Sequence, residues 1–123
     1  MKFEDIVILI SEEFTLAWNN WDVEKLIKLL AEDVTIFSPQ ISNIYPENTM
    51  NTLKGKKAIE AYWTLLKKKN AFLVKQISIK KVDREIKTVN IMIEGNLIIK
   101  ETFRLNEYGK IDYLKYEYET QSL

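Results

Sequence analysis

Apolar residues recur every three to four positions through much of the first half of the chain, which is the spacing of one face of an α-helix. The first such stretch runs from Phe3 to Trp18, the second from Val23 to Leu30 and the third from Ile59 to Leu66. Asp22 immediately precedes the second stretch, where its carboxylate can cap the helix. We therefore expect three N-terminal helices.

A short strand, Val34 to Phe37, is predicted between the second and third helices, and Pro39 ends it. The segment that follows, residues 38–53, has no periodicity and is rich in Ser, Pro, Asn and Thr, so we expect a long loop. A loop of this length is more often functional than accidental, for instance as the rim of a pocket.

From Phe72 onward the apolar period changes to two, which is typical of β-strands. The strands are expected at Phe72–Val82, Lys87–Ile93, Leu97–Leu105 and Ile111–Tyr118. Short turn sequences join them, so neighbouring strands should be antiparallel. These patterns predict a single α+β domain, residues 1–123, in which the three N-terminal helices pack in a strongly curved, mainly antiparallel sheet.

The composition narrows the chemistry that this domain could perform. Of 123 residues 46% are hydrophobic, and 18 basic side chains balance 18 acidic ones, which disfavours nucleic acid or a membrane surface as a partner. The chain has no Cys and no His, which excludes disulfides, thiolate nucleophiles, imidazole catalysis and ordinary zinc or haem sites. We expect no metal and no other cofactor, and proton transfer is left to Asp, Glu, Lys or Tyr.

The N-terminal segment carries no recognisable export or membrane signal. Its apolar run, Ile6 to Ile10, is five residues long and is flanked by acidic residues. A secretory signal needs at least ~7 apolar residues and a transmembrane helix ~20. A cytoplasmic location is therefore expected.

Alternation along the strand Leu97–Leu105 places a carboxylate in an apolar row. That row consists of Leu97, Ile99, Glu101, Phe103 and Leu105. A carboxylate on such a face must be ion-paired, hydrogen-bonded or protonated. Without a cationic partner, desolvation raises the pKa of Glu101 toward neutrality, where a Glu can act as general acid or base. A structural ion pair with Lys75, which interrupts the apolar row of its own strand, is the alternative, and both interpretations stay open.

The final strand and the tryptophans supply candidate walls for a pocket. Alternation predicts one face with Asp112, Leu114, Tyr116 and Tyr118, and an opposite face with Ile111, Tyr113, Lys115 and Glu117. The tyrosine-rich face can line a pocket, or it can serve sheet packing or a dimer interface. Trp18, Trp21 and Trp63 are expected in the core rather than around a ligand.

Three stretches carry a resemblance to a known superfamily: AWNNWDVEKLIKLLAEDVTIFSP, GKKAIEAYW and FRLNEYGKIDYLKYEY. In them the chain resembles the nuclear transport factor 2-like superfamily, particularly its SnoaL-like and ketosteroid-isomerase-like branches, and the likeness covers nearly the whole chain. The resemblance implies a cone-like, half-open barrel around a deep apolar pocket, and a homodimer. It does not imply one activity, because isomerases, cyclases, epoxide hydrolases and non-catalytic modules share this fold.

Few of the site residues of the steroid isomerases are present at the matching positions of this chain. Ser38 stands where that branch has its general-base Asp, and Phe14 stands where it has an oxyanion-hole Tyr. Leu30 and Trp63 stand where it has supporting tyrosines, and the His of the dehydratase branch is absent. Glu101 falls on the third polar position, and SnoaL-like cyclases use an acidic residue at about this strand position as base. The resemblance thus disfavours steroid isomerisation and singles out Glu101.

Two functional hypotheses follow. In the first, the domain binds a small apolar or aromatic ligand with Glu101 as its polar anchor, or as the acid and base of an isomerase- or cyclase-like enzyme acting on a carbonyl compound. The side chains expected to bind the ligand are Phe14, Trp18, Ile36, Ser38, Trp63, Phe103, Leu114, Tyr116 and Tyr118. In the second, the domain is a non-catalytic homodimerisation or scaffold module whose pocket is filled by its own side chains. The sequence leaves open whether the protein is an enzyme.

Overall fold

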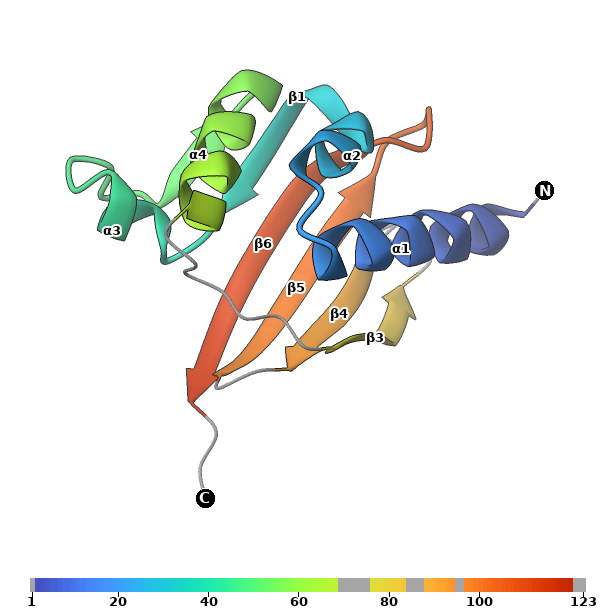
Figure 1. Ribbon diagram of the computed structural model, residues 1–123. Helices are drawn as coiled ribbons and strands as arrows, with labels where there is room; N and C mark the ends of the chain where they lie inside the picture. Colours follow the sequence, from blue (N-terminus) through green and yellow to red (C-terminus); the bar gives the residue numbers. More distant parts are fainter. Residues whose placement is uncertain (1, 69–75, 84–87, 95–96, 121–123) are drawn as a thin grey trace.

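The computed structural model describes residues 2–68, 76–83, 88–94 and 97–120. Helices α1 and α2 precede the first strand, α3 lies between the first two strands, and α4 follows them; four more strands come after α4 (Figure 1). The elements are α1 (Phe3–Asn19), α2 (Val23–Lys28), β1 (Leu30–Phe37), α3 (Ile41–Ile44), β2 (Thr52–Lys54), α4 (Lys56–Lys68), β3 (Gln76–Asp83), β4 (Thr88–Glu94), β5 (Leu97–Leu105) and β6 (Ile111–Thr120).

The strands form one six-stranded sheet in the order β2-β1-β6-β5-β4-β3. The neighbouring strands β1 and β6 are parallel, and the other neighbouring pairs are antiparallel. Helix α1 crosses β5, β4 and β3 on one face of the sheet, while α4 packs against β1 and β2 (Figure 1). Helix α2 contacts both α1 and α4. The predicted α+β architecture with N-terminal helices and a mainly antiparallel sheet is confirmed.

The predicted strong curvature of the sheet is wrong. The sheet is neither strongly curled nor closed, and β2 and β3 remain its two edges. Sheets bend sharply where bulges combine with glycine kinks inside strands. Gly55 and Gly109 lie outside the strands, and no residue within the bounds of a described strand is a glycine, so none of these strands carries such a kink. A cone-like barrel would need more curvature than these strands have.

The end of the second helix also differs from the prediction. Leu30 was expected on the apolar face of that helix, but α2 ends at Lys28 and Leu30 begins β1. Leu30 pairs with Ile111 of β6, whose backbone N–H donates to the Leu29 carbonyl at 2.9 Å. The hydrogen bonds of the neighbouring strand outweigh the local helical period here, and the Leu30 side chain is buried in either case.

The segment 38–53, predicted as a loop, contains the short helix α3 and the edge strand β2. Asn51 organises it: its backbone carbonyl accepts from the Ser38 N–H at 3.0 Å, and its side-chain oxygen accepts from the Ser42 N–H at 2.9 Å. Asn51 itself has a φ of 54°, a left-handed conformation that Asn tolerates better than most residues. Polar contacts of this kind leave no hydrophobic period in the sequence.

The start of β6 reverses one predicted face assignment. The register shifts by one residue, since Arg104 lies opposite Tyr113 but Leu105 lies opposite Ile111. This β-bulge turns Ile111 into the core, whereas Asp112 faces outward and pairs with the exposed Arg104 at 2.8 Å. Asp112 therefore does not share the face of Leu114 and Tyr116 as predicted.

The core lies between the helices and the sheet and is richest in aromatic rings around Trp18. The ring centroid of Trp18 lies 5.9 Å from Phe14, 4.9 Å from Trp21, 5.8 Å from Trp63 and 5.9 Å from Tyr116. Phe103 joins the group through Phe14, at 5.7 Å. We call these six residues the aromatic cluster. Trp18 and Trp63 are buried in the core as predicted, whereas Trp21 is partly buried and packs against it. Within the part of the chain that the structure describes, no helix could cross a membrane.

Candidate functional site

Glu101 lies in the middle of β5, opposite Ile91 of β4 and Tyr116 of β6. Its exposed fraction is 0%, and its neighbours along the same face, Phe103 and Leu105, are buried as well. Thr102 and Arg104, on the other face, are more accessible. The sequence-based prediction of a carboxyl group within an apolar row is therefore correct for the described part of this strand.

The environment of Glu101 favours its neutral form. Among the residues that the structure describes, no cation pairs with Glu101, and no donor meets either oxygen at full hydrogen-bond geometry. Burial raises the pKa of Glu101 to about 8, and the Tyr116 hydroxyl, acting as a donor toward the carboxyl, offsets only part of that rise. Glu101 is thus mainly protonated at neutral pH and can donate a hydrogen bond.

Lys75, the ion-pair partner in the alternative interpretation, lies outside the described residues. The pairing of Glu101 with Lys75 stays a prediction.

The structure places most of the predicted ligand-binding side chains in or beside the aromatic cluster. Phe14, Trp18, Trp63, Phe103 and Tyr116 belong to the cluster itself. Ile36 and Leu114 are buried in the same core. The side chain of Tyr118 lies outside the described part of the chain, although its backbone pairs with Ile99 in the sheet. Glu101 therefore lies opposite Tyr116, a member of the cluster, and Tyr116 in turn stacks on Trp18 of α1.

Ser38 occupies a different environment, which we call the Ser38–Tyr62 corner. The Ser38 hydroxyl accepts a hydrogen bond from the Tyr62 hydroxyl at 3.4 Å and another from the Gln40 N–H at 3.3 Å. Burial raises the pKa of Tyr62 to about 12, and the hydrogen bond to Ser38 offsets part of that rise. The hydroxyl of Ser38, predicted to touch a ligand, is here engaged in holding α4 to the end of β1.

Three buried polar atoms near the end of α1 were not singled out by the sequence. Thr15 Oγ1, Trp18 Nε1 and Trp21 Nε1 are buried and have no hydrogen-bond partner among the described residues. The sequence predicted the two tryptophans only as core residues. Their spacing of three along the chain, next to a helix end, was the signal that could have drawn attention to them as a pair.

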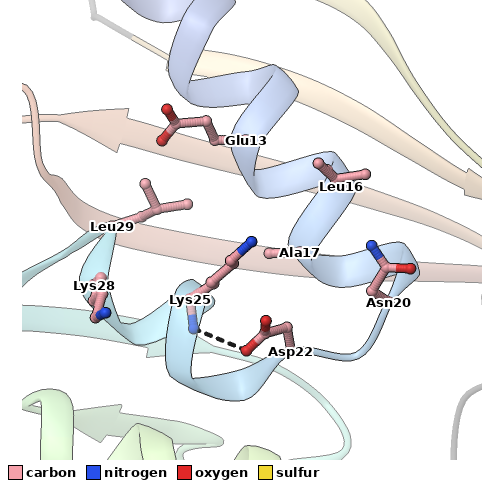
Figure 2. A pocket seen from close by; sticks show the side chains of 8 residues that line it. All are labelled: Glu13, Leu16, Ala17, Asn20, Asp22, Lys25, Lys28 and Leu29. Atoms are coloured by element: carbon pink, nitrogen blue, oxygen red, sulfur yellow. Dashed lines mark hydrogen bonds between the residues drawn. The ribbon is translucent and has the colours of Figure 1, made fainter.

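Two cavities lined by described residues lie away from Glu101. One, of about 350 Å³, lies between α1 and α2, with Glu13 and Leu16 on one side and Lys25 and Lys28 on the other (Figure 2). The other, of about 530 Å³, lies between the segment after α3 and helix α4, and Met50 contributes to its wall. Over the described ranges, no group of acidic side chains is arranged to hold a metal ion.

No family model and no curated protein matches the chain at a significant level. Solved structures match over nearly its whole length. A SnoaL-like protein of unknown function from Burkholderia thailandensis has a TM-score of 0.77 and is 20% identical, over 94% of this chain and 95% of its own. An NTF2-like protein of unknown function from Burkholderia xenovorans has a TM-score of 0.69 and is 11% identical, over 98% of this chain and 88% of its own.

A third similar structure is that of SalBIII, an epoxide hydrolase/cyclase-like enzyme with a role in pyran ring formation in the polyether salinomycin. Its TM-score is 0.68 and it is 17% identical, over 94% of this chain and 92% of its own. The chain therefore has the NTF2-like, SnoaL-like fold. Identities this low establish the fold and leave the function to the residues of the site.

Proposed function

We propose that this domain binds a small, mainly apolar carbonyl compound and that protonated Glu101 donates a hydrogen bond to the carbonyl oxygen. The observation that carries the proposal is the complete burial of Glu101 beside the aromatic cluster, with no ion pair among the described residues. A buried carboxyl group kept neutral is well suited to polarise a carbonyl group in an apolar surrounding.

The same group can serve as acid and then as base. If Glu101 passes its proton to the carbonyl oxygen, the resulting carboxylate can take a proton from the carbon next to the carbonyl. The carbonyl compound becomes its enol, and Glu101 is protonated again, so the step needs no other reactant. A pKa of about 8 is near the working pH, the condition under which one carboxyl group both gives and takes a proton efficiently.

Two substitutions separate binding from proton transfer. Glu101→Leu removes the hydrogen bond, whereas Glu101→Gln keeps an N–H donor but cannot transfer a proton. With 2-acetylnaphthalene as the probe and tryptophan fluorescence as the readout, we expect Glu101→Leu to weaken binding about tenfold at neutral pH. Glu101→Gln should bind within a few-fold of the wild type and lose the weakening that the wild type shows as pH rises through about 8.

Proton transfer is tested by exchange of deuterium for hydrogen next to the carbonyl of the same probe in D₂O, followed by NMR. The wild type should accelerate the exchange, and both Glu101 variants should not. Glu117→Gln is the matched control, because Glu117 is an exposed carboxylate on β6. Equal binding of the probe by the wild type and Glu101→Leu would contradict the proposal.

A second candidate function is a non-catalytic homodimerisation or scaffold module. The packing of the aromatic cluster favours it, because ring centroids 4.9 to 5.9 Å apart show that these side chains contact one another, as in an ordinary core. This function predicts a dimer in sedimentation at micromolar concentration, together with no binding of carbonyl probes. A monomer at that concentration would exclude the homodimer.

A further inference from the structure

The turn between α1 and α2 holds a tryptophan in a backbone conformation that disfavours it. Trp21 has a φ of 52°, in the left-handed region that usually takes Gly or Asn. The Trp21 N–H donates to the Trp18 carbonyl at 3.0 Å, and the Asp22 N–H donates to the Ala17 carbonyl at 2.8 Å. These two bonds are those of a Schellman motif, in which Trp21 occupies the position that glycine normally fills.

This strained backbone brings two indole rings together. The ring centroids of Trp18 and Trp21 lie 4.9 Å apart, with an angle of 44° between their planes. Both indole N–H groups are buried, and within the described part of the chain neither has an acceptor. An indole nitrogen can only donate, so each of these groups can be satisfied only by an acceptor, such as an oxygen atom.

The indole pair is connected to Glu101 through one aromatic side chain. The ring of Trp18, which is 3% exposed, stacks on the ring of Tyr116 at 5.9 Å. Tyr116 is in turn the cross-strand neighbour of Glu101. A row of aromatic rings thus links the Glu101 carboxyl group to two indole N–H donors that have no acceptor among the described residues.

Building on the proposed function, we infer that the ligand of this site carries two oxygen acceptors joined by an apolar body. One is the carbonyl oxygen that accepts from Glu101, and the other accepts from the indole N–H groups of Trp18 and Trp21. The substrate class is that of diketones and other dioxygenated compounds with an aromatic or alicyclic frame. A compound with a single carbonyl group can accept a hydrogen bond from Glu101 but leaves the indole N–H groups without an acceptor. A protonated amine in the second position could not bond to the indole pair, because both are donors.

A pair of probes that differ in one oxygen tests this inference. The probes are 2,6-diacetylnaphthalene and 2-acetyl-6-isopropylnaphthalene, which have nearly the same shape. The wild type should bind the diketone about three- to tenfold more tightly. Trp18→Phe and Trp21→Phe keep an aromatic ring and remove the N–H, so each should weaken binding of the diketone and leave the monoketone within about twofold.

Two further variants keep the test informative if one substitution disturbs folding. Trp21→Gly relieves the left-handed backbone, which offsets part of the packing lost with the ring. Because it removes the whole indole, it should weaken both probes, but the diketone more than the monoketone. Trp63→Phe is the matched control: it removes an indole N–H from the aromatic cluster but not from the pair, and should affect both probes equally. Circular dichroism and thermal melts accompany each variant.

The outcomes distinguish this inference from the proposed function. Equal affinity of the wild type for the two probes, or equal losses for both probes in Trp18→Phe and Trp21→Phe, overturns the two-acceptor inference. Glu101→Leu should weaken both probes. If it weakens neither, the proposed role of Glu101 fails, whatever the tryptophan variants do.

Discussion

Two buried tyrosines of this domain lie beside very different polar partners. In the Ser38–Tyr62 corner, the Ser38 hydroxyl accepts from Tyr62 at 3.4 Å and from the Gln40 N–H at 3.3 Å. At Tyr116, the partner is the Glu101 carboxyl, whose oxygens meet no donor at full hydrogen-bond geometry among the described residues. In the Ser38–Tyr62 corner the donors have an acceptor, whereas the Glu101 carboxyl group, which can transfer a proton, could form further hydrogen bonds.

The difference separates a structural polar contact from a candidate site. Burial raises the pKa of both groups, to about 12 for Tyr62 and to about 8 for Glu101. Tyr62 therefore keeps its proton at every physiological pH, but Glu101 can lose its proton with a modest rise in pH. A buried polar group that is hydrogen-bonded stabilises the fold. A buried polar group that lacks hydrogen bonds lowers stability, and such groups are expected at functional sites.

The largest expected effect is the pH dependence that Glu101 imposes on stability. Its pKa rises from 4.5 in the unfolded chain to about 8 in the folded protein, so the folded state holds a proton that the unfolded state releases. This contribution to stability is full below the unfolded pKa and is lost as pH rises through the folded pKa, at up to about 1.4 kcal/mol per pH unit. Urea unfolding across this range should show wild-type stability falling by a few kcal/mol relative to Glu101→Gln.

The control for this measurement is Glu117→Gln, which should keep the wild-type slope, since Glu117 is exposed. A Glu101→Gln variant whose stability follows pH as the wild type does would mean that Glu101 is charged in the folded protein, as in an ion pair with Lys75.

The second prediction concerns Ser38→Ala. The substitution leaves the buried Tyr62 hydroxyl and the Gln40 N–H without their acceptor, so it should lower the free energy of unfolding by about 1–3 kcal/mol. The loss should be the same at pH 5 and pH 8, in contrast to the effect of Glu101. Thermal denaturation at the two pH values measures this loss. A loss at only one pH would contradict the prediction that the Ser38–Tyr62 corner, unlike Glu101, contributes stability independently of pH.

Tyr62→Phe should have a smaller effect than Ser38→Ala. It removes one hydrogen-bonding partner while keeping the buried ring, and we expect a loss of about 1 kcal/mol. In the double variant with Ser38→Ala, the two losses should sum to more than the combined effect, because both substitutions remove the same bond. Additive losses in this double-mutant cycle would show that the two hydroxyls do not interact.

The smallest effect is expected on the exposed face of the sheet. Arg104 and Asp112 pair at 2.8 Å, with 52% and 22% of their side chains exposed. Asp112→Asn should cost about 0.5 kcal/mol at low salt and less at high salt, because solvent and ions screen such pairs. Denaturation at two salt concentrations tests this, and a cost above that of Ser38→Ala would mean that charge, rather than burial, dominates polar contacts in this domain.

The sequence predicted most elements because their signals are local. The helical period of α1, the cap at Asp22 and the alternation along β5 are properties of neighbouring residues, and the burial of Glu101 followed from that alternation. Predictions failed where a distant partner decided the outcome. Leu30 joins the sheet because β6 lies beside it, and the bulge at Asp112 comes from the register between β5 and β6.

In the candidate site, too, some features could be predicted from the sequence and others only from the tertiary structure. Sequence alone identified the carboxyl group, the aromatic residues and the absence of His and Cys, since these are matters of residue type and period. It could not show that the Ser38 hydroxyl accepts a hydrogen bond from Tyr62, or that the buried indole N–H groups of Trp18 and Trp21 have no acceptor in the described part of the chain. Hydrogen-bond satisfaction depends on distances between elements far apart in the chain, and only the tertiary structure sets those distances.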